Sequence, residues 1–415
     1  MTRVLRVSIG VSNLSFKTFD VVRTGIPQVV FHILKEAIAY EDASVEFVPI
    51  LRLPQANFTG LPDFLPLHFN ASQLVLRETL KELGVSIADA VRRWPYLQYL
   101  FGRKDARTAY ERACLEAIAD TDLYFEVAAS DVRNVVSGAR RLHPDLKYGL
   151  CVHDMCPLKH PEYVENSTHS WFRNQYRECL RKADFSISVS RSTAMDVLEQ
   201  ELKGGIYYAG LPSPLVRRGP PLSKRLREAF PTLRPRMYLC SLATLEPRKN
   251  LEALIDGFER FCHLFPDDAE TLQLVLVGVD GWKNRDLYSR ILGLGNVFCP
   301  GFVSDEDLEV LLSNALCLVL PSHYEGFGLS VAQAREYGIP VICAANTSLP
   351  EASGLNAIFV RLWLEDELAC CIRQVLRDSR AGMRSVGDDL FSTAKDWKEV
   401  LSRWVEVFQC VVLRK

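Results

Sequence analysis

The segment from Pro321 to Ile342 carries the strongest chemical pattern in the chain, because a loop with two glycines separates two apolar runs. A buried strand is expected over Leu316–Leu320, and a short helix is expected after the loop. Backbone N–H groups of such a loop, together with the start of the helix, form a binding site for an anion. Glu325 lies in the loop and Gln333 follows eight residues later. These two side chains could hold the two ends of a ligand with an anionic middle.

A second candidate group is the pair Arg248 and Lys249, which follows the expected strand Met237–Leu242. Asn250 is expected to cap the next helix, which places both cations beside a helix N-terminus. Two cations and a helix dipole suit a diphosphate whose negative charge grows as a bond to it breaks. The alternative interpretation is a solvated pair of charges on a loop.

His153 and Asp154 form the third group, directly after the expected strand Tyr148–Val152. A lone histidine is more often a hydrogen-bonded structural residue than a catalyst. The adjacent Asp154 and the position at a strand end favour a function, and spacing alone leaves both interpretations open. A weaker pattern is Gly25, between the first strand and a helix, which could let a phosphate approach the backbone or could serve as a plain connection.

Two pairs of aspartates could in principle hold a divalent cation. Asp305 and Asp307 follow Ser304, which fits a helix cap, and the other pair, at 120 and 122, precedes a strand, at the wrong end for a ligand. We therefore predict that both pairs are structural and that no metal is bound. The twelve cysteines are scattered, and several lie in apolar runs, which is typical of reduced thiols in a cytoplasmic protein.

Apolar β-type runs alternate with helical patterns along almost the whole chain, which predicts parallel sheets covered by helices. Ligands of such sheets lie beyond the carboxyl ends of the strands, so the three groups are expected to meet in a cleft between two doubly wound α/β domains. The expected units are an N-terminal domain over 1–210 with a helical insertion at about 70–120, a linker over 211–235, a C-terminal domain over 236–395 and a helix over 396–415 that packs across the domains. The expected strands are Val4–Val11, Val45–Leu51, Asp122–Val127, Tyr148–Val152, Phe185–Val189, Met237–Leu242, Leu272–Val277, Asn296–Cys299, Leu316–Leu320 and an apolar run after Pro340.

Composition excludes several classes of protein. The 415 residues carry a net charge of -2 without a long basic run, which argues against a general nucleic-acid binder. The sequence contains no run of eighteen apolar residues, so no membrane span is predicted. The first residues have the pattern of a strand rather than that of a secretory signal. Residues 92–104 mix aromatic and basic side chains. They could contact an anionic membrane surface or form a helix pair over the core.

Taken together, these loops resemble the retaining glycosyltransferases of the GT-B fold, specifically glycosyltransferase family 4. The matching stretches in the second half are Leu245–Leu251, Val277-Gly278, Gly281-Trp282, Gly301–Glu306, Pro321–Leu329, Leu349–Glu351 and Gly354. In the first half, Val152–Asp154, Pro157-Leu158, His160–Tyr163 and Ser188–Ser190 with Ser192 fit a subgroup that builds cell-surface polysaccharides.

The resemblance implies a role for each matching position. Arg248 and Lys249 would hold the donor diphosphate, Glu325 would contact the transferred sugar, and His153 and Asp154 would lie on the opposite wall near the acceptor. The backbone of Phe327–Leu329 would support phosphate or sugar, and the loop Gly301–Val303 would face the base. With Gly25, the candidate donor-binding positions are Gly25, Arg248, Lys249, Val303, Glu325, Gly326, Phe327, Gly328, Leu329 and Gln333, and the candidate catalytic positions are His153, Asp154, Glu325, Arg248 and Lys249.

The implied activity is transfer of a sugar, such as mannose, rhamnose or a related hexose, from a nucleoside diphosphate sugar to a hydroxyl of a growing glycan or lipid-linked glycan. The configuration would be retained without a metal or other cofactor. Two positions depart from the family: Gln333 replaces a glutamate that binds ribose, and Ala243 replaces a glycine near the donor. The alternatives are a nucleotide-sugar-binding protein without turnover, and a phosphorylase or epimerase of the same architecture.

Overall fold

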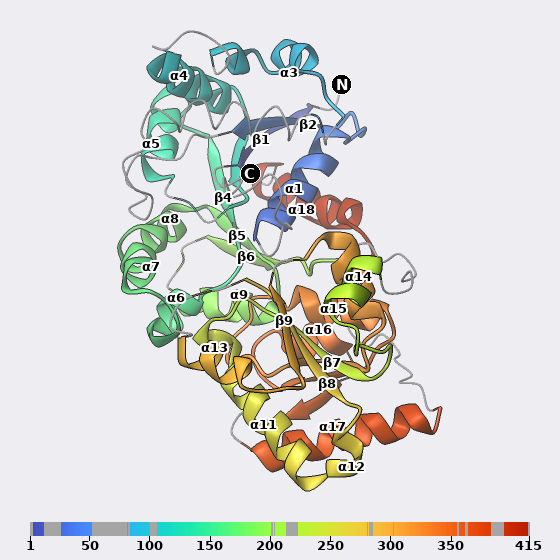
Figure 1. Ribbon diagram of the computed structural model, residues 1–415. Helices are drawn as coiled ribbons and strands as arrows, with labels where there is room; N and C mark the ends of the chain where they lie inside the picture. The colour runs from blue at the N-terminus through green and yellow to red at the C-terminus, as the bar shows by residue number, and fades with distance from the viewer. Residues whose placement is uncertain are drawn as a thin grey trace.

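The computed structural model describes residues 3–11, 26–51, 81, 84–99, 106–128, 130, 132–200, 202, 204–212, 223–279, 281, 285–301, 303–354, 357–361, 364–382 and 394–413. These residues form two six-stranded sheets, each covered by helices (Figure 1). Every strand pair within the two sheets is parallel, as the alternation of strand and helix patterns predicts. This is the two-sheet, Rossmann-like architecture of the GT-B fold.

The first sheet has the strand order β2-β1-β3-β4-β5-β6. Its strands are β1 (Leu5–Val11), β2 (Val45–Leu51), β3 (Leu123–Glu126), β4 (Lys147–Val152), β5 (Phe185–Ser188) and β6 (Gly205–Tyr208). The helices along this part of the chain are α1 (Ile26–Ile38), α3 (Ile87–Arg93), α4 (Ala106–Ala119), α5 (Arg133–Leu142), α6 (Cys156–Lys159), α7 (Asn166–Trp171), α8 (Arg177–Lys182) and α9 (Arg191–Leu198).

The second sheet has the order β12-β11-β10-β7-β8-β9. Its strands are β7 (Tyr238–Leu242), β8 (Gln273–Val277), β9 (Val297–Gly301), β10 (Cys317–Leu320), β11 (Val341–Ala344) and β12 (Ala357–Val360). The helices are α10 (Lys224–Ala229), α11 (Leu251–Leu264), α12 (Pro266–Ala269), α13 (Arg285–Leu292), α14 (Asp305–Ser313), α15 (Leu329–Glu336), α16 (Leu349–Ser353) and α17 (Glu365–Arg380).

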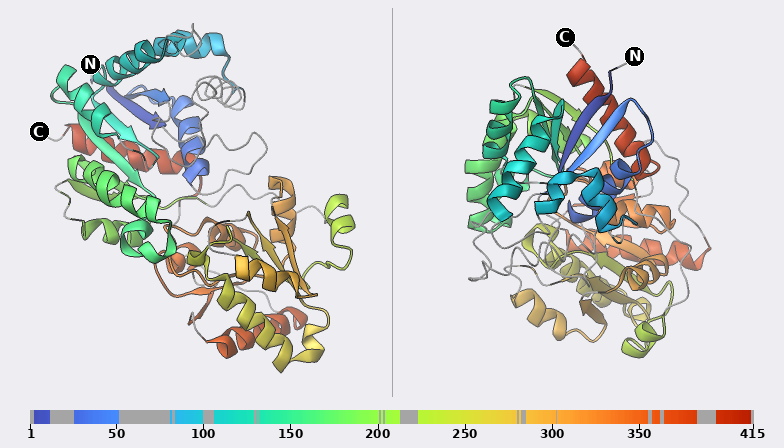
Figure 2. Two further views of the ribbon diagram at one scale, coloured as in Figure 1. Left: turned by 60° about the vertical axis from the view of Figure 1, so that its left-hand side comes forward. Right: turned by 90° about the horizontal axis from the view of Figure 1, so that it is seen from above.

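The last helix, α18 (Trp397–Leu413), packs on the first sheet (Figure 1). The ring of Phe125 in β3 lies 5.1 Å from the ring of Trp404 and 4.9 Å from that of Phe408. Trp397 stacks on His32 of α1 at 4.8 Å. Figure 2 shows from two further sides that α18 stays with the first sheet, whereas α17 stays with the second. The chain therefore returns to its first sheet after it has built the second.

The aromatic side chains of the helical insertion lie mostly in the core rather than on the surface. Trp94, Tyr96 and Leu97 are buried and belong to one cluster with the first sheet. Arg93 packs its guanidinium on the Trp94 ring at 4.9 Å, and Arg92 pairs with Asp89. Positions 100–105 lie outside the described residues. The part that is described fits a helix pair over the core with arginines at its rim, and no described helix is long and apolar enough to cross a membrane.

Both aspartate pairs take structural contacts. Asp120 and Asp122 pair with Arg6 and Arg3 respectively, and the backbone N–H of Asp307 donates to Ser304 Oγ at 3.1 Å, which confirms the predicted helix cap. Among the described residues no group of three or more His, Cys, Asp or Glu side chains could hold a metal ion. None of the twelve cysteines, which all lie in the described part of the chain, takes part in a disulfide bond.

Candidate active site

Strand order explains where the candidate site forms. In the second sheet, the chain moves outward in opposite directions from β7 and β10, which are neighbours. The loops that follow such a pair of strands diverge and leave a crevice at the carboxyl edge of the sheet. The loop with Arg248 and Lys249 follows β7, and the loop with Glu325 follows β10. The two strongest motifs of the sequence thus meet at the point where this fold binds ligands.

Glu325 is the centre of a buried ion cluster. Its Oε1 accepts a hydrogen bond from Lys249 Nζ at 2.7 Å and one from Ser322 Oγ at 2.7 Å, and its Oε2 accepts one from Arg248 at 3.1 Å. The side chain of Glu325 is only 8% exposed. Burial by itself raises the pKa of this carboxyl, but Lys249 and Arg248 more than offset burial and lower the pKa to about 2. Glu325 is therefore ionised at neutral pH.

Arg248 is held by two carboxylates and a carbonyl. It donates to Glu246 Oε1 at 2.6 Å, to Glu325, and to the carbonyl oxygen of Tyr324 at 2.9 Å. Burial lowers the pKa of the guanidinium, but Glu325 and then Glu246 raise it further, so the net shift is upward. Glu246, which is also buried, was not expected from the sequence to take part. Its place two residues before Arg248 was the signal that could have pointed to it.

The segment Thr347-Ser348 hydrogen bonds to the backbone of Glu325, and its own backbone is strained. Thr347 has φ 46°, in the left-handed region, which is unusual for a β-branched residue. Its Oγ1 accepts from the N–H of Glu325 at 3.1 Å, and Ser348 Oγ donates to the carbonyl oxygen of Glu325 at 2.9 Å. Strain of this kind persists only where surrounding contacts hold it, and it is concentrated at functional sites.

The start of α15 presents unused donors. Gly328 precedes the helix with φ 92°, a conformation that glycine adopts without strain. Within the described chain, the backbone N–H groups of Phe327, Gly328, Leu329 and Ser330 donate to no protein acceptor. These donors point from a helix N-terminus that carries a positive partial charge. Together with the adjacent cations they can bind an anion such as a diphosphate.

We call the unit built on the first sheet the first domain and the unit built on the second sheet the second domain. His153 lies in the first domain, where its Nε2 is 2.6 Å from the carbonyl oxygen of Val127. A carbonyl only accepts, so Nε2 carries the proton. Burial lowers the pKa of His153, and the contacts with Val127 and Asp154 offset that effect in part. The imidazole is therefore neutral at neutral pH, which leaves Nδ1 as an acceptor. The neighbouring Asp154 accepts from the N–H of Cys156 at 3.1 Å.

The two walls of the site touch at Gly326. A Cβ placed on Gly326 would lie 2.0 Å from the carbonyl oxygen of His153 and 2.9 Å from the Cβ of Asp154. Only glycine therefore allows this approach of backbone to backbone. The structure thus brings the predicted residues His153, Asp154, Glu325, Arg248 and Lys249 into one region.

Other predicted positions have different surroundings. Asn250 begins α11, but its backbone is left-handed (φ 52°) and its side chain makes no capping hydrogen bond, so the predicted cap is wrong. Val303 is buried in the core under the second sheet. Gln333 hydrogen bonds to Tyr337, whose hydroxyl donates to Glu309 at 2.9 Å, so its contacts lie away from the Glu325 cluster. Gly25 lies outside the described residues.

Ala243, the second departure from the family pattern, lies where two loops cross. A Cβ on Gly278 would lie 1.9 Å from the carbonyl oxygen of Ala243. It is therefore Gly278, after β8, that allows the close approach of the backbone at this edge of the sheet.

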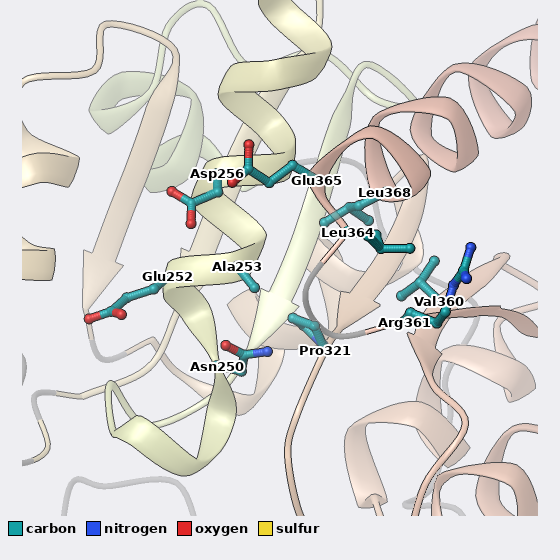
Figure 3. A pocket seen from close by; sticks show the side chains of 10 residues that line it. All are labelled: Asn250, Glu252, Ala253, Asp256, Pro321, Val360, Arg361, Leu364, Glu365 and Leu368. Carbon is teal, nitrogen blue, oxygen red and sulfur yellow. The ribbon is translucent and has the colours of Figure 1, made fainter.

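A pocket of about 230 Å³ opens beside this site, between α11 and α17. Figure 3 shows Glu365 of α17 reaching toward Asp256 of α11, with Asn250 and Pro321 at the opposite end. Arg248, Lys249 and Glu325 do not line it. The pocket is therefore separate from the ion cluster, although Asn250 directly follows Lys249 in the chain.

Comparison with known proteins defines the class. Residues 224–385 match the family described as Glycosyl transferases group 1. The structure of Anabaena Alr3699/HepE in complex with UDP-glucose has the same fold, with a TM-score of 0.60 over 99% of this chain and 98% of that one, at 15% identity. The chain therefore has the GT-B fold, and its second half is similar to the glycosyl transferases group 1 family.

Its relatives among characterised proteins include two mannosyltransferases of Escherichia coli. O-antigen chain mannosyltransferase B is 34% identical over 145 residues, which represent 34% of this chain and 37% of the relative. The serotype-specific mannosyltransferase WbdA is 29% identical over 231 residues, which represent 49% of this chain and 26% of WbdA. The similarity thus spans less than half the length of both relatives.

Proposed function

We propose that this protein transfers a hexosyl group from a nucleoside diphosphate sugar to a hydroxyl of a cell-surface glycan. The observation that carries the proposal is the cluster of Arg248, Lys249 and Glu325 beside the free N–H groups at the start of α15. Such a site suits a diphosphate, the group that nucleoside diphosphate sugars share. The matching family and the mannosyltransferase relatives support the transfer of a sugar, with mannose or a related hexose such as rhamnose as the first candidates.

In the proposed reaction, the bond between the anomeric carbon and the diphosphate oxygen breaks while a bond to the acceptor oxygen forms on the same face of the sugar. The configuration is then retained, and the proton of the acceptor hydroxyl passes to the departing diphosphate. Arg248, Lys249 and the α15 donors stabilise the charge that grows on this diphosphate. In this scheme the neutralising charge is supplied by the protein, and no metal or other cofactor is required.

The remaining residues have positioning roles in this scheme. Glu325 is ionised and fixes both cations, and it contacts a hydroxyl of the transferred sugar from the donor side. His153 offers the unprotonated Nδ1, and Asp154 offers a carboxylate, from the acceptor side. We place the reaction in the cytoplasm because twelve cysteines without a disulfide bond suit a reducing compartment. The growing glycan or lipid-linked glycan would bring the enzyme to the membrane surface.

A panel of nucleoside diphosphate sugars tests the proposal. The donor should raise the melting temperature of the protein, because a ligand that binds only the folded state stabilises it. The same donor should then be turned over with a glycan acceptor, and an NMR spectrum of the first product should show the anomeric configuration of the donor. A protein that no nucleotide sugar stabilises would contradict the proposal.

Binding without turnover is the alternative that one observation favours. Gln333 stands where the family carries a glutamate, and its side chain hydrogen bonds to Tyr337. A binding protein would be stabilised by the donor but would release no free diphosphate product. Measurement of donor hydrolysis and transfer with the stabilising donor separates the two functions.

A further inference from the structure

Helix α9 of the first domain carries a buried polar face that is directed at the donor loop of the second domain. Ser190, Thr193 and Asp196 stand three residues apart, so they share one side of the helix. All three are buried, with exposed fractions of 0%, 0% and 7%. We call these three residues the α9 polar face. Buried polar groups are costly unless they are hydrogen-bonded, so their partners define what the face recognises.

Partners of all three side chains lie in the loop that contains Glu325, at Tyr324 and Gly326, the residues on either side of Glu325. Asp196 also pairs with Lys159 of the first domain. Ser190 Oγ donates to the carbonyl oxygen of Gly326 at 2.7 Å, and Thr193 Oγ1 donates to the same oxygen at 3.0 Å. The hydroxyl of Tyr324 donates to Asp196 Oδ2 at 2.5 Å and accepts from the N–H of Met155 at 3.2 Å. The residues on both sides of Glu325 are therefore fixed by the first domain, although Glu325 itself is fixed by the second.

The second domain also supplies an acceptor for backbone donors of the first domain. Glu351 of α16 accepts from the backbone N–H groups of Arg191 and Ser192, both at 2.8 Å. The second domain thus supplies a carboxylate to the N-terminus of α9, where free N–H groups and the helix dipole favour a negative charge. Each domain satisfies polar groups of the other, and separation of the domains would break all of these bonds together.

We propose that the α9 polar face and Glu351 form an interdomain clasp that positions the donor loop. The physical link is the planar trans peptide between Gly326 and Phe327, in which the C=O and the N–H point in opposite directions. When Ser190 and Thr193 hold the carbonyl of Gly326, they also fix the direction of the Phe327 N–H, which is one of the unused donors. The contact between the two domains is thereby coupled to the affinity of the donor loop for the diphosphate. This inference rests on the proposed function.

The sharpest test exchanges the Thr193 hydroxyl for a methyl group. Thr193→Val keeps the shape and removes one donor to Gly326, whereas Thr193→Ser keeps the hydroxyl. The valine variant should raise the KM for the donor by about threefold to tenfold, the factor carried by one hydrogen bond, and the serine variant should restore it. A loss of folded protein would lower kcat without raising KM. Equal donor KM values in the wild type and the valine variant would overturn the clasp.

Amide hydrogen exchange at Arg191 and Ser192 tests the clasp without any turnover. Their N–H groups donate to Glu351 of the other domain, so their exchange reports separation of the domains. Thr193→Val should accelerate it by about threefold to tenfold, although the substitution removes neither of these bonds. Ser86→Ala, which removes a side-chain hydrogen bond at the start of α3, a helix that takes no part in these contacts, should leave it unchanged. An unchanged rate in the valine variant would contradict the inference.

The same measurement separates the two proposals. UDP and GDP are the probes, and binding of either nucleotide by the wild type should slow exchange at Arg191 and Ser192. If neither these two nucleotides nor any nucleotide sugar of the panel binds, but Thr193→Val still accelerates exchange, the clasp stands and the proposed function fails. If a nucleotide binds but neither it nor the substitution changes exchange, the function stands and the clasp is refuted.

Discussion

Lys249 Nζ lies 2.7 Å from Glu325 Oε1, although 76 positions of the chain separate the two residues. The contact joins the loop after β7 to the loop after β10, and Arg248 reinforces it with a second bond to the same carboxylate. A buried carboxylate with two cations is restrained before any ligand enters. An anion that binds here meets side chains that are already in place, which lowers the ordering cost of binding.

Replacement of Lys249 by alanine should reduce turnover by about 10²- to 10³-fold, the loss that follows when one stabilising donor of a developing charge is removed. The KM for the donor should also rise, because the diphosphate loses a charged partner. Steady-state kinetics with the donor found in the panel measure both effects. Lys398→Ala removes an exposed lysine of α18 and should leave both unchanged. Normal turnover by the Lys249 variant would contradict the phosphate assignment.

Glu325→Gln should destabilise the protein at pH 7 by about 3–5 kcal/mol, because the substitution leaves two buried cations short of a partner. In the wild type, the pKa of Glu325 is about 2, below its ordinary value of 4.5. The ionised carboxylate therefore stabilises the fold fully above pH 4.5, and this contribution is lost as the pH falls toward 2. The difference between the two proteins should shrink over that interval.

Urea denaturation at pH 7 and at several lower pH values measures this difference. Glu46→Gln is the control, since Glu46 pairs with Arg6 at an exposed site and such pairs contribute about 0–1 kcal/mol. A difference between wild type and the Glu325 variant that stays constant from pH 7 to pH 3 would refute the role of the ionised carboxylate.

Gly326→Ala should abolish donor binding, because the new methyl group would collide with the carbonyl oxygen of His153. A backbone atom cannot turn aside as a side chain can, so the loop or the domain contact must shift. Gly295→Ala is the matched control, since a methyl group there meets open space. Calorimetric titration with UDP and GDP measures the effect, and unchanged affinity in the Gly326 variant would show that the approach to His153 is dispensable.

Gln333→Glu restores the residue that the family usually carries. If position 333 contacts ribose, the charge-assisted bond should tighten nucleotide binding by about fivefold. Unchanged affinity would instead mean that the side chain stays with Tyr337. The titration that is used for Gly326→Ala decides between these outcomes, and Gln374→Glu on the exposed side of α17 controls for the added charge.

The sequence predicted the strands that have strong apolar runs, and it missed β6 and β12. Both are four residues long and lie at the edge of a sheet, where partial exposure weakens the apolar pattern. Arg248, Lys249 and Glu325 could be located because each follows a clear strand. Ser190, Thr193 and Glu351 received no role from their types, since their function depends on how the two domains meet, which local patterns do not encode.

The return of α18 to the first sheet means that the first unit is built from two separate pieces of chain, whereas the second unit is built from one continuous piece between them. Fragments that stop before residue 394 would lack Trp404 and Phe408, whose burial completes the core around Phe125. A ribosome must therefore synthesise the chain through α18 before the first unit can finish folding. The chain also passes twice between the units, so two connections join them. Two connections restrict the rotation of one unit against the other more than a single connection would.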